Sequence, residues 1–95
     1  MNVAQVHRNA FVLTPAEQRI MPYLTAGFTS KGIGEMLGLS EYTISCHRDQ
    51  IYGKLTIRGR AQLASYALIH GMVTEEQVID IWRQYAPHLL EHIDP

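Results

Sequence analysis

Residues 37–40 restrict the fold more than any other stretch, because a helix stop and a helix start follow each other directly there. Gly38 is typical of the position at which a helix ends, since glycine adopts the left-handed backbone without a steric penalty. Ser40 is typical of an N-cap, whose hydroxyl accepts a hydrogen bond from a first-turn amide. Only Leu39 lies between the two signals. The sequence therefore predicts two helices joined by a tight turn, the arrangement of a helix-turn-helix.

A longer helix is expected over residues 41–55, directly after Ser40. Ile44, Ile51 and Leu55 recur at the spacing of one helix face and predict the side that packs on the core. The opposite side carries polar, small and aromatic residues that packing does not require, so it is available to a binding partner. The candidate residues on this side are Tyr42, Ser45, Cys46, Asp49 and Gln50.

Capping signals predict a first helix that begins at Pro15. Thr14 can cap it, proline suits the first helical position, and Glu17 completes a capping box. Gly27 is a fitting stop. A short second helix is expected over residues 30–37, where two interior glycines lower the helix propensity, so neighbouring helices must stabilise it.

Two further helices are expected in the C-terminal part of the chain. One covers residues 60–70 and ends at Gly71. A second capping box, Thr74 with Gln77, opens another helix over residues 75–85. No stretch shows the alternation of a β-strand. The predicted fold class is therefore all-α, a four-helix helix-turn-helix bundle with an extra C-terminal helix.

The composition excludes several classes of protein. No run approaches the roughly 18 apolar residues that a membrane span requires, and no basic segment precedes an apolar one as in a signal peptide. The single cysteine, Cys46, excludes an internal disulfide and suits a reducing compartment, so we expect a cytoplasmic protein. No nucleophile–base arrangement, phosphate-cradling glycine loop or metal-ligand cluster is present, so neither an enzyme, a cofactor nor a metal is predicted.

Charge is distributed unevenly along the chain. Residues 29–60 carry five lysines and arginines against three carboxylates, whereas residues 61–95 carry one arginine against five carboxylates. The positive charge therefore gathers around the predicted third helix. This distribution is a mild indication of a nucleic-acid backbone as partner.

Short segments spread from Leu13 to Val73 form one continuous pattern. They are Leu13-Thr14-Pro15 with Glu17, Gly27, Lys31, Ile33, Leu37-Gly38-Leu39-Ser40, Thr43-Ile44, His47, Ile51, Lys54-Leu55, Arg58, Arg60-Ala61-Gln62-Leu63, and Tyr66-Ala67 through Gly71. In this order and spacing they resemble the LuxR/FixJ/GerE-type DNA-binding domain, a four-helix module with a central helix-turn-helix. Several independent segments agree, which makes the resemblance specific.

The resemblance implies a bacterial-type transcriptional regulator that binds double-stranded DNA in a sequence-specific manner. Its third helix would enter the major groove and its fourth would pair with a second copy, so that a homodimer addresses a two-fold operator. The resemblance covers a LuxR-type domain over residues 13–73, followed by a helical extension over 74–95. Residues 1–12 precede it as an N-terminal arm, for which a nascent helix or a linker remnant are the alternatives. Met1 and this extension favour a stand-alone module over an excised one.

With the third helix in the major groove, the five candidate residues on its outer side are the candidates for contact with base edges. The resemblance and the charge pattern together nominate two further groups of residues. The candidates for phosphate contact are Lys31, Thr43, Arg48, Lys54, Arg58 and Arg60. The candidates for the dimer interface are Leu63, Tyr66, Ala67, His70, Val78, Ile81, Trp82 and Tyr85. The last four form an apolar stripe with two interpretations, a partner face or packing on the domain's own core. His47 matches the family but points toward the scaffold, which favours a structural role.

The chain also departs from the family pattern. Ser45 stands where the family often has lysine, and Asp49 near where it frequently has a basic residue. These changes support an alternative function, an antagonist impaired in DNA binding that pairs with or sequesters another regulator. Salt-dependent binding to duplex DNA separates the two hypotheses. For the double variant Thr43→Ala with Lys54→Ala, we predict lost DNA binding at an unchanged melting temperature.

Overall fold

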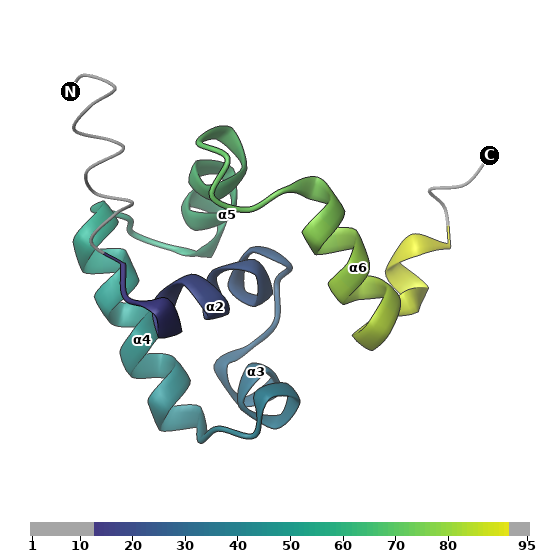
Figure 1. Ribbon diagram of the computed structural model, residues 1–95, viewed down its shortest axis with the longest axis horizontal. Helices are drawn as coiled ribbons and strands as arrows, with labels where there is room; N and C mark the ends of the chain where they lie inside the picture. Colours follow the sequence, from purple (N-terminus) through teal and green to yellow (C-terminus); the bar gives the residue numbers. More distant parts are fainter. Residues whose placement is uncertain (1–12, 92–95) are drawn as a thin grey trace.

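The structure, a computed structural model, describes residues 13–91 of the chain, so the predicted N-terminal arm lies outside the described residues. Five α-helices and one short 3₁₀ helix occupy this part of the chain, and it contains no strand (Figure 1). The elements are α2 (Pro15–Thr25), α3 (Ser30–Leu37), α4 (Glu41–Leu55), α5 (Arg60–Ile69), α6 (Glu75–Tyr85) and η1 (Pro87–Leu90). The predicted all-α class is confirmed, and each predicted helix is present.

Helix α2 begins as its capping signals predict. The Thr14 hydroxyl accepts a hydrogen bond from the Glu17 amide at 3.1 Å, and Glu17 Oε1 accepts one from the Thr14 amide at 2.8 Å. Pro22 lies inside the helix, which nevertheless continues to Thr25. The Pro22 carbonyl accepts a hydrogen bond from the Ala26 amide at 2.8 Å, so the last turn is closed beyond the proline.

The turn between α3 and α4 has the geometry that residues 37–40 predict. Gly38 has a φ of 71°, and the Ser40 hydroxyl accepts a hydrogen bond from the Thr43 amide at 3.0 Å. Gly34 fits beneath this turn because it lacks a side chain, since a Cβ there would lie 2.5 Å from the Leu39 carbonyl oxygen. The short connection therefore holds α3 and α4 close together.

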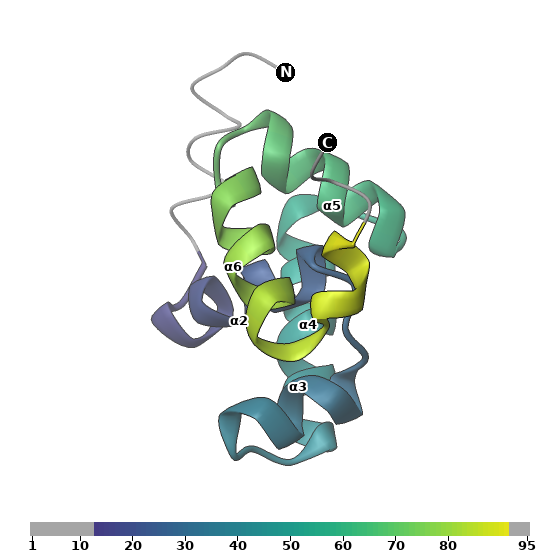
Figure 2. The same cartoon turned by 90° about the vertical axis from the view of Figure 1, so that its right-hand side faces the viewer.

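One hydrophobic core joins α2, α3, α4 and α5. Buried aliphatic side chains from all four helices fill it, and the fully enclosed ones are Ile20, Met21, Leu24, Ile33, Ile44, Ile51 and Leu63. The side of the third helix that was predicted to pack on the core is confirmed, because Ile44, Ile51 and Leu55 are all buried. Figures 1 and 2 place α6 on the opposite side of α2 from α4. No helix in the described part of the chain is long and apolar enough to cross a membrane.

Helix α6 is attached to the bundle through its aromatic residues. Trp82 Nε1 donates a hydrogen bond to the Ala26 carbonyl at 2.8 Å. The Tyr85 ring lies 6.4 Å, centroid to centroid, from the rings of both Tyr23 and Phe28. Of the two interpretations that the apolar stripe of this helix allows, packing on the domain's own core is the one observed for these residues.

Candidate nucleic-acid interface

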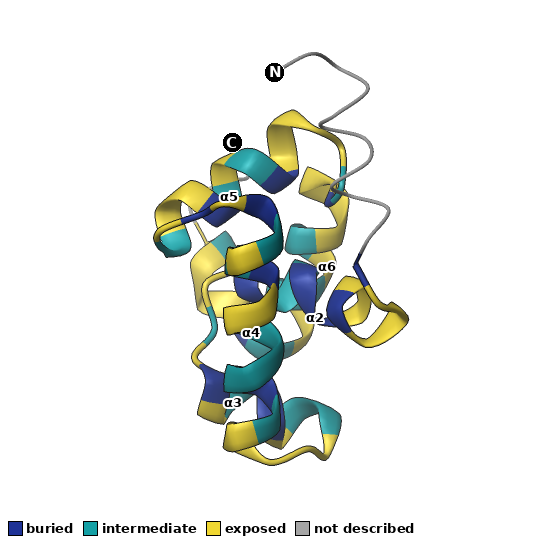
Figure 3. Cartoon of the chain, turned by 90° about the vertical axis from the view of Figure 1, so that its left-hand side faces the viewer, coloured by how far each residue is buried: buried dark blue, intermediate teal, exposed yellow. Residues whose placement is uncertain are grey.

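The side of α4 that faces away from the core is uncovered by the described helices. Figure 3 shows α4 in front of the rest of the bundle, with exposed and half-buried residues along its outer side. Tyr42, Asp49 and Gln50 are exposed there, while Ser45 and Cys46 are half-buried. All five predicted base-reading candidates therefore reach the surface of the same helix.

Tyr42 extends furthest from this surface, with 78% of its area exposed. It lies one turn before Cys46, and a hydrogen bond with the Cys46 side chain raises the pKa of Tyr42. The phenol therefore keeps its proton at neutral pH. It presents both a donor and an acceptor, together with an apolar ring, at the first turn of the helix.

Arg48 and Asp49 form an ion pair at the middle of α4. Arg48 Nε and Nη2 both lie 3.1 Å from Asp49 Oδ1. Arg48 Nη1 also donates a hydrogen bond to the hydroxyl of Ser30, the first residue of α3, at 3.2 Å. The guanidinium of Arg48 is therefore held between two helices by contacts within the chain.

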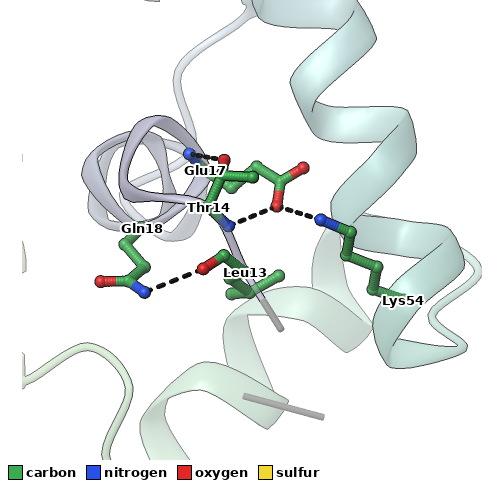
Figure 4. A network of polar contacts seen from close by, with 5 residues as sticks. All are labelled: Leu13, Thr14, Glu17, Gln18 and Lys54. Atoms are coloured by element: carbon green, nitrogen blue, oxygen red, sulfur yellow. Dashed lines mark hydrogen bonds and ion pairs between the residues drawn. The ribbon is translucent and has the colours of Figure 1, made fainter. Parts of the chain in front are cut away.

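Lys54 also has a partner within the chain. Its Nζ lies 2.6 Å from Oε1 of Glu17, a side chain with 0% of its area exposed (Figure 4). Burial by itself raises the pKa of Glu17, but the hydrogen bond and charge of Lys54, with the Thr14 amide, bring that pKa below its ordinary value. The Glu17–Lys54 pair therefore joins α2 to the last turn of α4 and keeps Glu17 ionised.

The other predicted phosphate contacts fall into two groups. Arg60 donates a hydrogen bond to the Phe28 carbonyl and so braces α5 against the start of α3. The side chains of Lys31 and Arg58 are exposed and make no polar contact with any described residue. Thr43 is half-buried in the first turn of α4, with its hydroxyl 2.8 Å from that of Ser40.

The predicted dimer interface is corrected at several positions. Leu63 and Ala67 are fully buried in the core of the single chain, because they face α2, and cannot be reached by a second copy in this conformation. Val78 is half-buried and packs against the same core. Ile81 is half-buried and lines an open groove of about 410 Å³ between α2 and α6.

The exposed side of α5 is a different stripe from the one predicted. Tyr66 is half-buried and its ring lies 4.3 Å from that of the exposed His70. Beside them Leu68 and Ile69 are 45% and 78% exposed. The signal that could have found Ile69 is its phase, because exposed Ala61, Gln62, Ser65, Leu68 and Ile69 share one helix face.

His47 lies between the two faces of α4. Its ring is half-buried, as expected of a residue turned toward the scaffold, and its Nδ1 makes no hydrogen bond within residues 13–91. In the same part of the chain, no group of three metal-ligating side chains lies together.

Comparisons with known proteins agree with this geometry. Residues 11–67 match the family model for bacterial regulatory proteins of the luxR family. The chain is 38% identical over 71 residues to the transcriptional regulatory protein MctR of Rhizobium johnstonii, which covers 75% of the chain and 33% of MctR. It is 37% identical over 62 residues to the Fimbriae Z protein of Escherichia coli, covering 65% of the chain and 30% of that protein.

Another relative is the oxygen regulatory protein NreC of Staphylococcus epidermidis, 33% identical over 57 residues that cover 60% of the chain and 26% of NreC. The chain thus spans about a third or less of the length of these relatives. No solved structure matches it. The family match covers more than half of the chain and coincides with α2 to α5, the bundle that carries the helix-turn-helix. The chain therefore belongs to the luxR family of bacterial regulatory proteins and carries that family's DNA-binding domain.

Proposed function

We propose that the chain binds DNA as a homodimer, with α4 in the major groove and α5 as the pairing helix. The observation that best supports this proposal is that no described helix covers the outer side of α4, the second helix of a luxR-type helix-turn-helix. An uncovered helix can enter the major groove of B-DNA, which is wide enough to admit it. The names of the relatives add support, since MctR is called a transcriptional regulatory protein.

The phosphate contacts are proposed for the groups that the fold itself does not use. Lys31, in the first turn of α3, and Arg58, between α4 and α5, extend into solvent from positions that flank α4. Thr43 is added as a third candidate because it lies in the first turn of α4, where the helix dipole favours an anion; it would contact a phosphate in addition to its bonds with the Ser40 hydroxyl. Arg48, Lys54 and Arg60 would have to exchange contacts within the chain for a phosphate.

We predict that affinity for a duplex falls steeply with salt and that Arg58→Ala makes this dependence shallower. Each cation that neutralises a phosphate contributes a slope of about −0.9 to a plot of log affinity against log salt. The variant should therefore lower the slope by about one per chain, as measured by fluorescence anisotropy of a labelled duplex between 50 and 200 mM salt.

Arg19→Ala is the matched control, because Arg19 is an exposed arginine that lines the groove between α2 and α6, away from α4. This control should keep the slope of the unchanged protein. Salt-independent binding, or no binding, would contradict the proposal. Equal slopes for the two variants would show that Arg58 does not contact a phosphate.

We further predict that Ile69→Glu disrupts pairing and weakens binding to a two-fold operator by more than about tenfold, because a charge replaces the most exposed of the large apolar side chains of α5. Analytical ultracentrifugation of the protein–duplex complex should change from two chains per duplex to one. Leu89→Glu on η1 makes the same replacement at another exposed apolar site and should leave two chains bound. One chain per operator in the unchanged protein would exclude the dimer.

A further inference from the structure

Asp49 is an exposed carboxylate in the middle of the helix that is proposed to enter the major groove. Its side chain is 68% exposed and follows Cys46 by three residues along the outer side of α4. A carboxylate at this position would be repelled by the phosphate backbone. Its presence therefore requires either a poor DNA-binding surface or a specific partner inside the groove.

A carboxylate can only accept hydrogen bonds, which limits what it can recognise on a base edge. Guanine and thymine present acceptors to the major groove, which an ionised carboxylate repels. Adenine presents a donor, its N6 amino group, directly beside the acceptor N7. Cytosine presents the N4 amino group as its hydrogen-bonding group, so it is the base that an aspartate accepts from most favourably.

The contacts of Asp49 leave one oxygen for such a bond. Both contacts from Arg48, through Nε and Nη2, go to Oδ1 at 3.1 Å. No other described residue contacts Asp49. The guanidinium thus offsets the negative charge that phosphates would repel and fixes the orientation of the carboxylate, while no residue among 13–91 forms a hydrogen bond or ion pair with Oδ2.

The orientation of this pair is set from the neighbouring helix. Ser30 is a buried hydroxyl, 6% exposed, that accepts from Arg48 Nη1 at 3.2 Å. Ser30, Arg48 and Asp49 therefore form a chain of contacts from the start of α3 to the outer side of α4. The Arg83–Asp80 ion pair of α6, at 2.8 Å, has no third polar partner among the described residues and so provides a comparison.

We infer that Asp49 selects a cytosine in each half-site of the operator, and that Ser30 is a positioning residue for it through Arg48. This inference rests on the proposed function, because it requires α4 to lie in the major groove. By its charge alone, Asp49 suggests a protein impaired in DNA binding. In this inference the same carboxylate is instead a residue that reads the operator. The carboxylate lowers non-specific attraction to phosphate and in return contributes base selection.

The test is selection of binding sites from a pool of randomised duplexes by the purified full chain, followed by affinity measurements on single-base variants of the selected site. The unchanged protein should select cytosine at one position of each half-site, with a preference over adenine of about tenfold. Asp49→Asn should move the preference at this position to adenine, whose N6 and N7 suit a carboxamide. Preferences at the other positions should stay.

Asp80→Asn is the matched control for charge, since it removes the same charge from an exposed, ion-paired aspartate on α6. It should leave the selected site unchanged. Ser30→Ala should lower the cytosine preference by roughly threefold, because Arg48 loses the hydroxyl that orients it, at an unchanged salt slope. Ser30→Thr, which keeps the hydroxyl, should restore the preference.

The outcomes separate this inference from the proposed function. A selected site whose cytosine persists in Asp49→Asn would overturn the inference while the proposed function stands. A Ser30→Ala protein with full cytosine preference would overturn the role of Ser30. A protein that selects no site and binds no duplex would overturn the proposed function, and the inference with it.

Discussion

Lys54→Met is expected to lower the free energy of unfolding by about 3 kcal/mol, because it leaves the buried carboxylate of Glu17 without its cation. Within residues 13–91, Glu17 Oε2 has no hydrogen-bond partner, whereas Oε1 contacts both Lys54 Nζ and the Thr14 amide. Urea denaturation followed by far-UV circular dichroism measures the loss. Lys31→Met, an exposed lysine without a polar partner among the described residues, is the control.

The effect of Lys54→Met should depend on pH in a defined direction. The folded pKa of Glu17 lies below the ordinary 4.5, so the stability that its charge contributes is present above pH 4.5 and is lost as the pH falls through the folded value. Without Lys54, burial acts to raise that pKa. The difference between the two proteins should therefore shrink on acidification, from the raised pKa of Glu17 in the variant down to its lowered pKa in the unchanged protein.

The double variant Glu17→Gln with Lys54→Met separates the pair from its parts, because it removes both charges. It should lose less stability than Lys54→Met alone, and its free energy of unfolding should change less with pH in the acid range. If Lys54→Met and Lys31→Met were equally stable at neutral pH, the pair would have no structural role. Such a result would return Lys54 to the candidates for phosphate contact that the sequence pattern gave.

This pair also corrects the prediction made for Thr43→Ala with Lys54→Ala. A surface lysine could be removed at an unchanged melting temperature, but a lysine that pairs with a buried carboxylate cannot. Loss of DNA binding by that double variant would therefore report unfolding as well as a lost contact. Arg58→Ala is the cleaner test of phosphate contact.

Trp82→Ala is expected to cost about 2–3 kcal/mol, below the usual range for a tryptophan in a core because Trp82 is half-buried. The change removes the packing of α6 and leaves the buried carbonyl of Ala26 without its donor. Trp82→Phe keeps a ring but not the N–H, so a loss of about 1–2 kcal/mol is expected from the hydrogen bond. Thermal denaturation by far-UV circular dichroism measures both.

Gln84→Ala, on the exposed side of α6, should leave stability nearly unchanged. DNA affinity should stay the same in Trp82→Phe, because α6 lies on the opposite side of α2 from α4. A Trp82→Ala protein as stable as the unchanged protein would show that α6 is not part of the folded unit. Weakened DNA binding by a folded Trp82→Phe protein would instead connect α6 to the interface.

The helices could be predicted closely because their signals are local. Thr14 with Glu17 and Thr74 with Gln77 lie three residues apart, and Gly38 with Ser40, two residues apart, fixes a turn within four residues. Such signals act through backbone hydrogen bonds that are the same in any protein. The buried side of α4 followed from helical periodicity for the same reason.

The sequence by itself thus determined the fold class, the helix-turn-helix and the family, because these depend on contacts between residues close in the chain and on their spacing. Tertiary structure alone decided which cations are committed within the chain. Lys54 meets Glu17 from 37 residues away, and Arg48 meets Ser30 from 18. It also decided that Trp82 faces inward. A side chain's charge and polarity are local properties, whereas its partner and exposure depend on which other helix packs against it.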